Sequence, residues 1–272
     1  MEWFLKVPKI LHVYWGSTNL SYLRFLTVQS FMKQNPDWEV MLWHPMYQAS
    51  VVTWNTGELN YAKDWKNFSD KLMQLPITKI PVDCTKYGLS NNISEVHKSD
   101  SLRFWMLSEY GGIWSDMDIL YFQPITKLMV NSPINDDIET FVCISHYGHS
   151  NGFFMSAKGS KFFHAMQKLS IQELQPSKYQ SNGVNACNKY FPTLSSINRI
   201  SPVADIGMDA VYAHDGQHIK DIYSNKPPRF TEYSIGLHWY GGSAETGKFL
   251  KDTNGGLENI PDNIIGNVLK RI

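Results

Sequence analysis

The feature that most constrains the fold is a strand, helix and strand pattern near the start of the sequence. Residues 10–15, ILHVYW, form an almost continuous apolar run that ends at Gly16, as in a strand buried on both faces. Residues 22–33 place apolar side chains at helical spacing until Pro36, and residues 38–43, WEVMLW, are typical of a second strand. This order predicts a βαβ unit of an α/β domain, whose ligands bind beyond the carboxyl ends of parallel strands.

The rest of the 272 residues fits one such domain, because a chain of this length can bury a sizeable core. Further strands and helices are expected in the segments 141–145, 151–156, 161–169, 235–240 and 264–272. Residues 45–92 lack clean periodicity and contain prolines and aromatic residues. We therefore expect a loop-rich insertion that acts as a lid or as a surface for a second substrate, with a plain helical excursion as the alternative.

Composition excludes several classes of partner. The chain has 25 basic and 25 acidic residues, so no overall field favours nucleic acid or an anionic membrane, and membrane association is expected to be peripheral at most. The sequence has no apolar run of the ~18 residues that span a bilayer, and no signal-peptide pattern. Its three cysteines have no metal-ligand spacing and are expected to be buried free thiols. These features together predict a cytoplasmic protein.

Residues 94–121 contain the strongest local pattern. Ser94 is a good helix cap, Glu95 suits the first turn, and apolar positions support a helix up to Gly111 and Gly112, which end it. The chain is then expected to re-enter the sheet as a strand over residues 113–116. This pattern places the next polar residues at a strand end.

Asp116 and Asp118 are those polar residues, and they are separated by Met117. In an extended segment alternate side chains share a face, so one divalent cation can contact both carboxylates. Mg²⁺ and Mn²⁺ take one or two protein carboxylates together with substrate phosphates and water. The pair therefore predicts a metal site that a diphosphate completes, although a solvated strand end would give the same three residues.

Asp100 and Arg103 lie on one face of the preceding helix, because they are three residues apart. One interpretation is a surface ion pair, which stabilises a helix by roughly 0.2–0.5 kcal/mol. The functional interpretation is that Arg103 binds a phosphate or a sugar hydroxyl while Asp100 accepts hydrogen bonds from sugar hydroxyls.

The segment KSDSLRFWMLSEYGGIWSDMDILYFQPI, residues 98–125, resembles the core motif of the DXD-containing glycosyltransferases. That family includes yeast α-mannosyltransferases and bacterial capsule and lipooligosaccharide transferases, and the glucosylating clostridial toxins are more distantly similar. PKILHVYWG at 8–16, NGFFMSAKGSKFF at 151–163 and LHWYGGS at 237–243 are similar to three further family segments. The sequence departs from the family pattern at Ala244, where Trp is common.

The resemblance implies a GT-A fold, a Rossmann-like and mostly parallel sheet flanked by helices in a single domain. It implies retaining transfer of a hexose from a nucleotide sugar, with a UDP-sugar favoured and GDP-mannose as the alternative, to a glycan, lipid-linked or protein acceptor. By the same resemblance, Trp15 would lie against the nucleotide base, Asp100 and Arg103 would hold the donor sugar, and Asn151 would face the reacting sugar.

The resemblance also implies a Mn²⁺ or Mg²⁺ site. Asp118 would bind the metal directly, and Asp116 would reach ribose or sugar hydroxyls and a metal-bound water. His238 and Ser243, in a C-terminal active-site loop over residues 236–247, would close over the diphosphate, and one of them would complete the metal sphere. Asp116, Asp118 and Arg103 are thus the candidate catalytic residues, and His238 joins the two aspartates as a candidate ligand.

Two other classes of function share part of this residue pattern. A haloacid-dehalogenase-like phosphohydrolase also uses an Asp-x-Asp at a strand end, with the first Asp as nucleophile. That motif would be expected near the N-terminus and followed by Thr or Val, whereas here Ile119 follows it. A non-catalytic glycan-binding module would agree with the 14% aromatic content, but it would not need the acidic pair together with Asp100 and Arg103.

Overall fold

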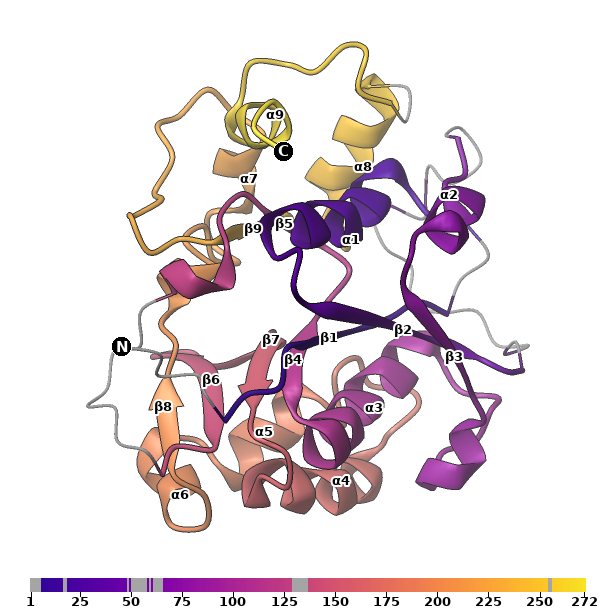
Figure 1. The fold of residues 1–272 in the computed structure, drawn as a ribbon, viewed down its shortest axis with the longest axis vertical. Coiled ribbons are helices and arrows are strands. Elements are labelled where there is room, and N and C mark those ends of the chain that lie inside the picture. Colours follow the sequence, from indigo (N-terminus) through magenta and orange to yellow (C-terminus); the bar gives the residue numbers. More distant parts are fainter. Residues whose placement is uncertain are drawn as a thin grey trace.

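The computed structural model describes residues 6–16, 19–47, 49, 58, 60, 66–128, 137–253 and 256–272. Its centre is a seven-stranded sheet of order β3-β2-β1-β4-β7-β6-β8 (Figure 1). The strands are β1 (Ile10–Tyr14), β2 (Glu39–Pro45), β3 (Thr78–Val82), β4 (Gly112–Ser115), β6 (Thr140–Ser145), β7 (Gly148–Ser156) and β8 (Val203–Asp205). Within this described sheet β7 alone runs antiparallel to its neighbours, so the mostly parallel sheet expected from the sequence is confirmed.

Helices and a second, two-stranded sheet cover the two faces of the central sheet. The helices are α1 (Tyr22–Gln34), α2 (Ser69–Gln74), α3 (Glu95–Tyr110), α4 (Lys161–Glu173), α5 (Val184–Tyr190), α6 (Leu194–Asn198), α7 (Ile219–Ile222), α8 (Ala244–Asp252) and α9 (Ile264–Leu269). The second sheet pairs β5 (Ile119–Tyr121) with β9 (Gly236–His238). Figure 1 shows α3, α4 and α5 on one side and α1, α8, α9 and the β5–β9 pair on the other.

The two sides bury separate apolar cores. Leu23, Phe31 and Leu237 belong to the core beneath α1 and β9, whereas Phe104 and Phe162 belong to the core beneath α3 and α4. The expected βαβ unit is present, because β1 pairs with β2 in parallel across α1. In the described part of the chain, no helix combines the length and apolar character that crossing a bilayer requires.

The C-terminal helix and the three cysteines agree with the sequence expectations. Helix α9 packs its apolar face on the domain core, as expected for the C-terminal segment. Cys84, Cys143 and Cys187 are buried free thiols, which also agrees with the sequence interpretation.

The structure departs from the expected loop-rich insertion over residues 69–87. These residues form α2, the strand β3 and the 3-10 turn η2 (Cys84–Tyr87). Among the described residues, strand β3 pairs only with β2 at the edge of the sheet. An edge strand tolerates Pro81 because one side of its backbone does not need to donate to a neighbouring strand. Much of residues 48–65 lies outside the described residues, so the lid role remains a prediction.

The turn from α3 into β4 requires its glycine pair. Gly111 and Gly112 have φ of 69° and 94°, values that disfavour side chains with a Cβ. A Cβ at Gly111 would lie 2.6 Å from the Lys158 amide nitrogen, and one at Gly112 would lie 2.5 Å from the Ile10 carbonyl oxygen. The glycines therefore let the chain pass between β1 and β7, and this passage fixes where β4 delivers the acidic pair.

His12 connects this turn to the sheet and makes stability depend on pH. Its Nε2–H donates to the Gly111 carbonyl at 2.8 Å, and its Nδ1 accepts from the Trp43 indole at 3.1 Å. Burial lowers the pKa of His12 from 6.5 to about 4, against the opposing effect of the Gly111 carbonyl. The unfolded chain therefore binds the proton first, and stability is lost as the pH falls from about 6.5 toward 4.

We expect His12 to account for a loss of about 2 kcal/mol in the free energy of unfolding between pH 7 and pH 5. Urea unfolding at the two pH values measures this loss. The variant His12→Gln keeps a donor and an acceptor but does not titrate, so its loss should be smaller by that amount. An identical pH dependence in both proteins would contradict this assignment.

Candidate active site

The acidic pair lies in a turn that leaves the central sheet. Strand β4 ends at Ser115, residues 117 and 118 form a turn, and β5 begins at Ile119. The extended conformation expected through the acidic pair is therefore wrong. The reason is that β5 pairs with β9 in a second sheet rather than continuing the ladder of β4. Met117 is 2% exposed and packs into the core, while both carboxylates line the same cavity.

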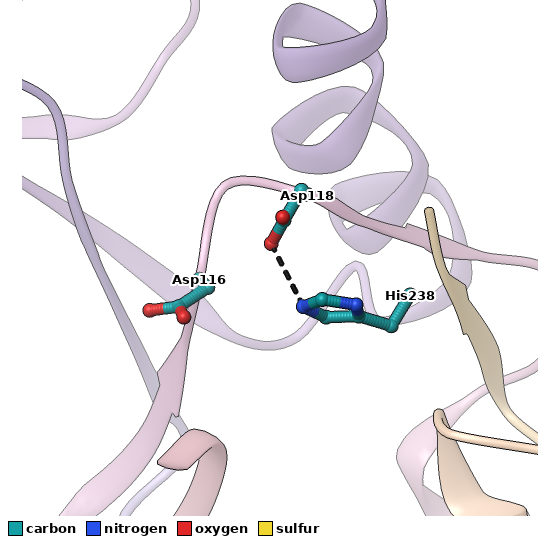
Figure 2. Close-up of side chains that lie close together, drawn as sticks. All are labelled: Asp116, Asp118 and His238. Atoms are coloured by element: carbon teal, nitrogen blue, oxygen red, sulfur yellow. Dashed lines mark ion pairs between the residues drawn. The ribbon is translucent and has the colours of Figure 1, made fainter. Parts of the chain in front are cut away.

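His238 approaches Asp118 because β9 pairs Ile119 with His238. The His238 Nε2 lies 3.1 Å from the Asp118 Oδ1, and Figure 2 shows the carboxylate pointing at the ring. Ligand atoms of Asp116, Asp118 and His238 all lie within 4.8 Å of one another. Burial would raise the pKa of the Asp118 carboxyl, but His238, Arg24 and the Gly241 amide hold it well below its usual range.

These residues fit a divalent cation. The contact between Asp118 Oδ1 and His238 is at ion-pair distance, yet neither Asp118 Oδ1 nor His238 Nδ1 has a hydrogen-bond partner among the described residues. A buried carboxylate oxygen without a hydrogen bond is unfavourable, and a bound cation would remove that penalty. The two carboxylates also suit Mn²⁺ or Mg²⁺, which commonly keep further positions for phosphate and water.

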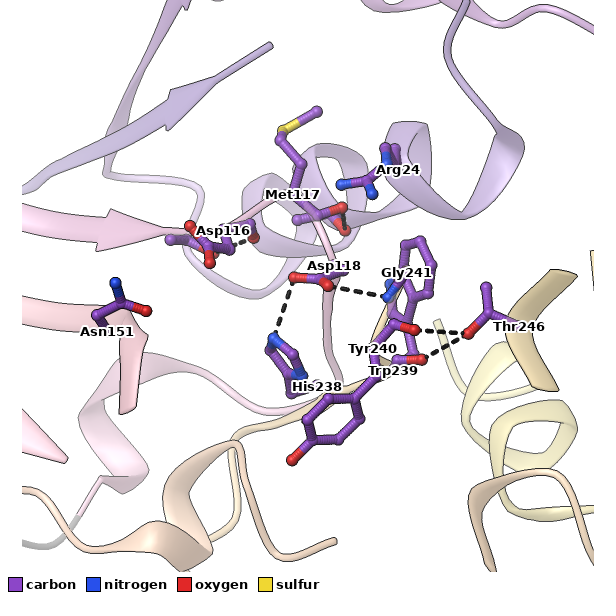
Figure 3. A network of polar contacts seen from close by, with 12 residues as sticks. Arg24, Asp116, Met117, Asp118, Asn151, His238, Trp239, Tyr240, Gly241 and Thr246 are labelled. Atoms are coloured by element: carbon purple, nitrogen blue, oxygen red, sulfur yellow. Dashed lines mark hydrogen bonds and ion pairs between the residues drawn. The ribbon is translucent and has the colours of Figure 1, made fainter. Parts of the chain in front are cut away.

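The C-terminal loop folds directly onto Asp118 (Figure 3). The Gly241 amide donates to Asp118 Oδ2 at 3.0 Å, and the Trp239 amide donates to the Asp118 carbonyl at 2.8 Å. The Thr246 hydroxyl in α8 donates to the Trp239 carbonyl at 3.0 Å. Ser243 caps α8, since its hydroxyl accepts from the Thr246 amide at 3.2 Å, and it also lines the cavity next to Asp118. The structure thus brings this distant segment to the acidic pair.

Arg103 forms ion pairs with two carboxylates, Asp100 and Asp116. Its guanidinium lies 2.7 Å from Asp100 Oδ1 and 3.3 Å from Asp116 Oδ1, and it also donates to the Asn151 carbonyl. Its remaining N–H groups donate to Ser99, and the side chain is 3% exposed. Each guanidinium nitrogen therefore contacts protein, which differs from the expectation of an arginine that extends to a phosphate.

Asp100 is held in the same cluster. The Asn151 amide donates to Asp100 Oδ1 at 3.2 Å, while Asp100 Oδ2 has no hydrogen-bond partner among the described residues. Burial raises the pKa of Asp100 to about 6, although Arg103 opposes this rise. A free carboxylate oxygen at the wall of a cavity is suited to accept a hydrogen bond from a ligand hydroxyl.

Two cavities meet at the acidic pair. Their shared walls are Asp116, Asp118, Asn151, Tyr179, Gln180 and Gly242. The smaller, of about 200 Å³, adds Trp15, Arg24, Glu58, Glu95, Asp100 and Arg103. The larger, of about 610 Å³, adds His149, Tyr212, His238, Tyr240 and Ser243. Gln180 and Tyr240 are the described non-glycine residues with positive φ, and such backbone strain is concentrated at functional sites.

Sequence reasoning missed Arg24 of α1. Its guanidinium lies 4.4 Å from the centroid of the Trp15 ring and 5.3 Å from that of Trp239. Its Nε donates to the Glu58 carboxylate at 2.7 Å. Burial lowers the pKa of Arg24, but Glu58, Asp118 and Asp116 together outweigh burial and raise it. The available signal was a single arginine inside the apolar pattern of residues 22–33. Arg24 gives the smaller cavity a second cation.

Comparisons with known proteins agree with this geometry. The family model for the "glycosyltransferase sugar-binding region containing DXD motif" matches residues 24–137. Inositol phosphoceramide mannosyltransferase 1 of Schizosaccharomyces pombe is 23% identical over 256 residues, which are 88% of this chain and 64% of the relative. This chain thus spans less than two thirds of the length of that relative.

Two solved structures are similar at low identity. The PaToxG glycosyltransferase has a TM-score of 0.46 and 16% identity, over 71% of this chain and 73% of its own. An active-site mutant of LgtC has a TM-score of 0.44 and 13% identity, over 93% of this chain and 98% of its own.

Proposed function

We propose that this chain is a metal-dependent retaining glycosyltransferase. The premise is that residues 24–137 match the family model for the sugar-binding region of the DXD-motif glycosyltransferases. The proposed enzyme moves a hexose from a nucleotide sugar to a hydroxyl of a glycan, lipid-linked or protein acceptor. The observation that carries this proposal is the convergence of Asp116, Asp118 and His238 between two cavities, next to the Asp100–Arg103 pair. A UDP-sugar is the favoured donor, and the mannosyltransferase relative supports GDP-mannose as the alternative.

Asp116, Asp118 and His238 would hold Mn²⁺ or Mg²⁺. When bound, such an ion supplies positive charge where negative charge develops on the leaving diphosphate. The Gly241 amide keeps the Asp118 carboxylate in place, and Arg103 does the same for Asp116. We therefore assign Arg103 to positioning the two carboxylates that it touches rather than to direct contact with phosphate.

The smaller cavity is assigned to the donor. Trp15 would stack on the base, Arg24 would attract the diphosphate, and the free Oδ2 of Asp100 would accept from a donor sugar hydroxyl. Asn151 donates to Asp100 and lines both cavities, so it would face the reacting sugar. Ser243, at the first turn of α8, would lie near the diphosphate, where helix amides favour negative charge.

A panel of UDP- and GDP-sugars tests the proposal. The purified chain is incubated with each donor and Mn²⁺, and nucleotide release is measured with and without a chelator. Release that depends on the metal and on one class of donor is the expected result. A glycan-binding module would release no nucleotide, and a phosphohydrolase would instead hydrolyse simple phosphoesters such as p-nitrophenyl phosphate.

Trp15→Ala is expected to weaken nucleotide binding about tenfold, because stacking of a base on an aromatic ring contributes roughly 1–3 kcal/mol. Titration calorimetry with the nucleoside diphosphate and Mn²⁺ measures the change. Trp15→Phe is the matched variant, since it keeps an aromatic face and should retain most of the affinity. An affinity of Trp15→Ala equal to that of the wild type would remove Trp15 from the donor site.

A further inference from the structure

The larger cavity contains a buried hydroxyl that the roles above do not use. Tyr212 follows the 3-10 turn η4 (Met208–Ala210), is 5% exposed, and packs its ring against His238 at a centroid distance of 5.0 Å. Its hydroxyl has no hydrogen-bond partner among the described residues. A buried hydroxyl without a partner costs roughly 1–3 kcal/mol. At a cavity wall, this cost indicates that a ligand completes the hydrogen bonding.

Gly152 shows where this hydroxyl points. A Cβ built on Gly152 would lie 2.7 Å from the Tyr212 hydroxyl oxygen and 2.9 Å from Asp116 Oδ2. The two oxygens therefore face the same small region beside β7. Any larger residue at position 152 would clash with both oxygens, so glycine allows the Tyr212 hydroxyl and Asp116 to approach β7 this closely.

The two cavities differ in charge. Both cavities are lined by carboxylates, but in the smaller one Arg24 and Arg103 offset part of that negative charge. No Lys or Arg is found among the described residues that line the larger cavity. The larger cavity instead presents the rings of Tyr179, Tyr212 and Tyr240 beside the acidic pair. Aromatic faces with a few polar groups suit a sugar ring, and nearby carboxylates repel an anion. Its volume of about 610 Å³ is typical of a small-ligand site.

We propose that Tyr212 is an acceptor-binding residue, whose hydroxyl forms a hydrogen bond with a hydroxyl of an uncharged, polyhydroxylated acceptor in the larger cavity. This inference rests on the proposed glycosyl transfer. Because the contact is made to the acceptor, it affects transfer but not the slow hydrolysis of the donor by water.

Tyr212→Phe removes only the hydroxyl and tests the inference. Nucleotide release without an acceptor is measured first, with the donor preferred in the panel above, and then transfer to methyl hexosides. Hydrolysis should stay within about twofold of the wild type, while kcat/KM for the acceptor should fall about tenfold. Thermal unfolding should show equal or higher stability, because the lost hydroxyl has no protein partner. If the Tyr212 hydroxyl had only a structural role, the Tyr212→Phe variant would unfold at a lower temperature than the wild type.

Tyr190→Phe is the matched control. Its hydroxyl donates to Glu173 at 2.7 Å outside both cavities, so its removal should leave hydrolysis and transfer unchanged. Equal loss of hydrolysis and transfer in Tyr212→Phe would place Tyr212 on the donor side and overturn the inference. Unchanged transfer in this variant would also overturn it. Hexose 6-phosphates should be at least tenfold poorer acceptors than the methyl hexosides. Equal transfer to both would overturn the assignment of an uncharged acceptor. A wild type that neither hydrolyses nor transfers would overturn the proposed function itself.

Discussion

Asp118→Asn is expected to lower metal-dependent transfer by roughly a thousandfold while leaving the fold intact. Asparagine has the shape of aspartate, and its carbonyl can still accept from the Gly241 amide. It removes the negative charge that faces His238 and that a divalent cation requires. Initial rates of transfer and of nucleotide release, measured over a range of Mn²⁺ concentrations, test this expectation.

Asp37→Asn is the control for a general effect of losing a carboxylate. Asp37 pairs with Lys9 at the surface, away from the cavities, and its replacement should leave the rates unchanged. The thermal midpoint of Asp118→Asn should stay within about 4 °C of the wild type, so that lost activity is separated from unfolding. Full Mn²⁺-dependent activity in a folded Asp118→Asn protein would show that the metal site is misassigned.

Much of the fold was predictable because its signals are local. The apolar run of β1, the helical spacing of α1 and the glycines after α3 each fix one element through a few neighbouring residues. The glycine pair was informative because each glycine meets backbone atoms of another strand or turn at a distance that excludes a Cβ. The resemblance to the DXD-motif glycosyltransferases was drawn from segments 8–16, 98–125, 151–163 and 237–243. The family model, which matches residues 24–137, and the mannosyltransferase relative confirm it.

The unpredicted parts depend on contacts between distant segments. The turn at residues 116–118 forms because β5 pairs with β9, more than a hundred residues later, and no local pattern encodes that pairing. Arg24 of α1 and Tyr212 after η4 line the cavities only because these segments pack beside the acidic pair. Neither residue belongs to a local sequence motif that would mark it as part of a site. Strand β3 was missed because a proline such as Pro81 argues against a strand unless that strand lies at the edge of a sheet. The edge position of β3 follows only from its pairing with β2.

Arg103→Met is expected to have the largest effect on stability, lowering the free energy of unfolding by about 3–5 kcal/mol. Arg103 and Asp100 are each 3% exposed and lie 2.7 Å apart, so removal of the cation leaves a buried carboxylate without compensation. Methionine fills a similar volume, and the loss is therefore electrostatic rather than a cavity effect. Urea unfolding at pH 7 measures it, and transfer should also fall because Asp116 loses its nearest cation.

A double-mutant cycle with Asp100→Asn separates this electrostatic cause from a packing defect. If the uncompensated charge is responsible, the double variant should unfold at a higher urea concentration than Arg103→Met alone, since its buried side chain is neutral. Its transfer activity should remain low, because Asp116 still lacks the guanidinium that lies 3.3 Å from it. Recovery of stability without recovery of activity would show that Arg103 both compensates the buried charge of Asp100 and supports Asp116 in transfer. A double variant no more stable than Arg103→Met would contradict the electrostatic account.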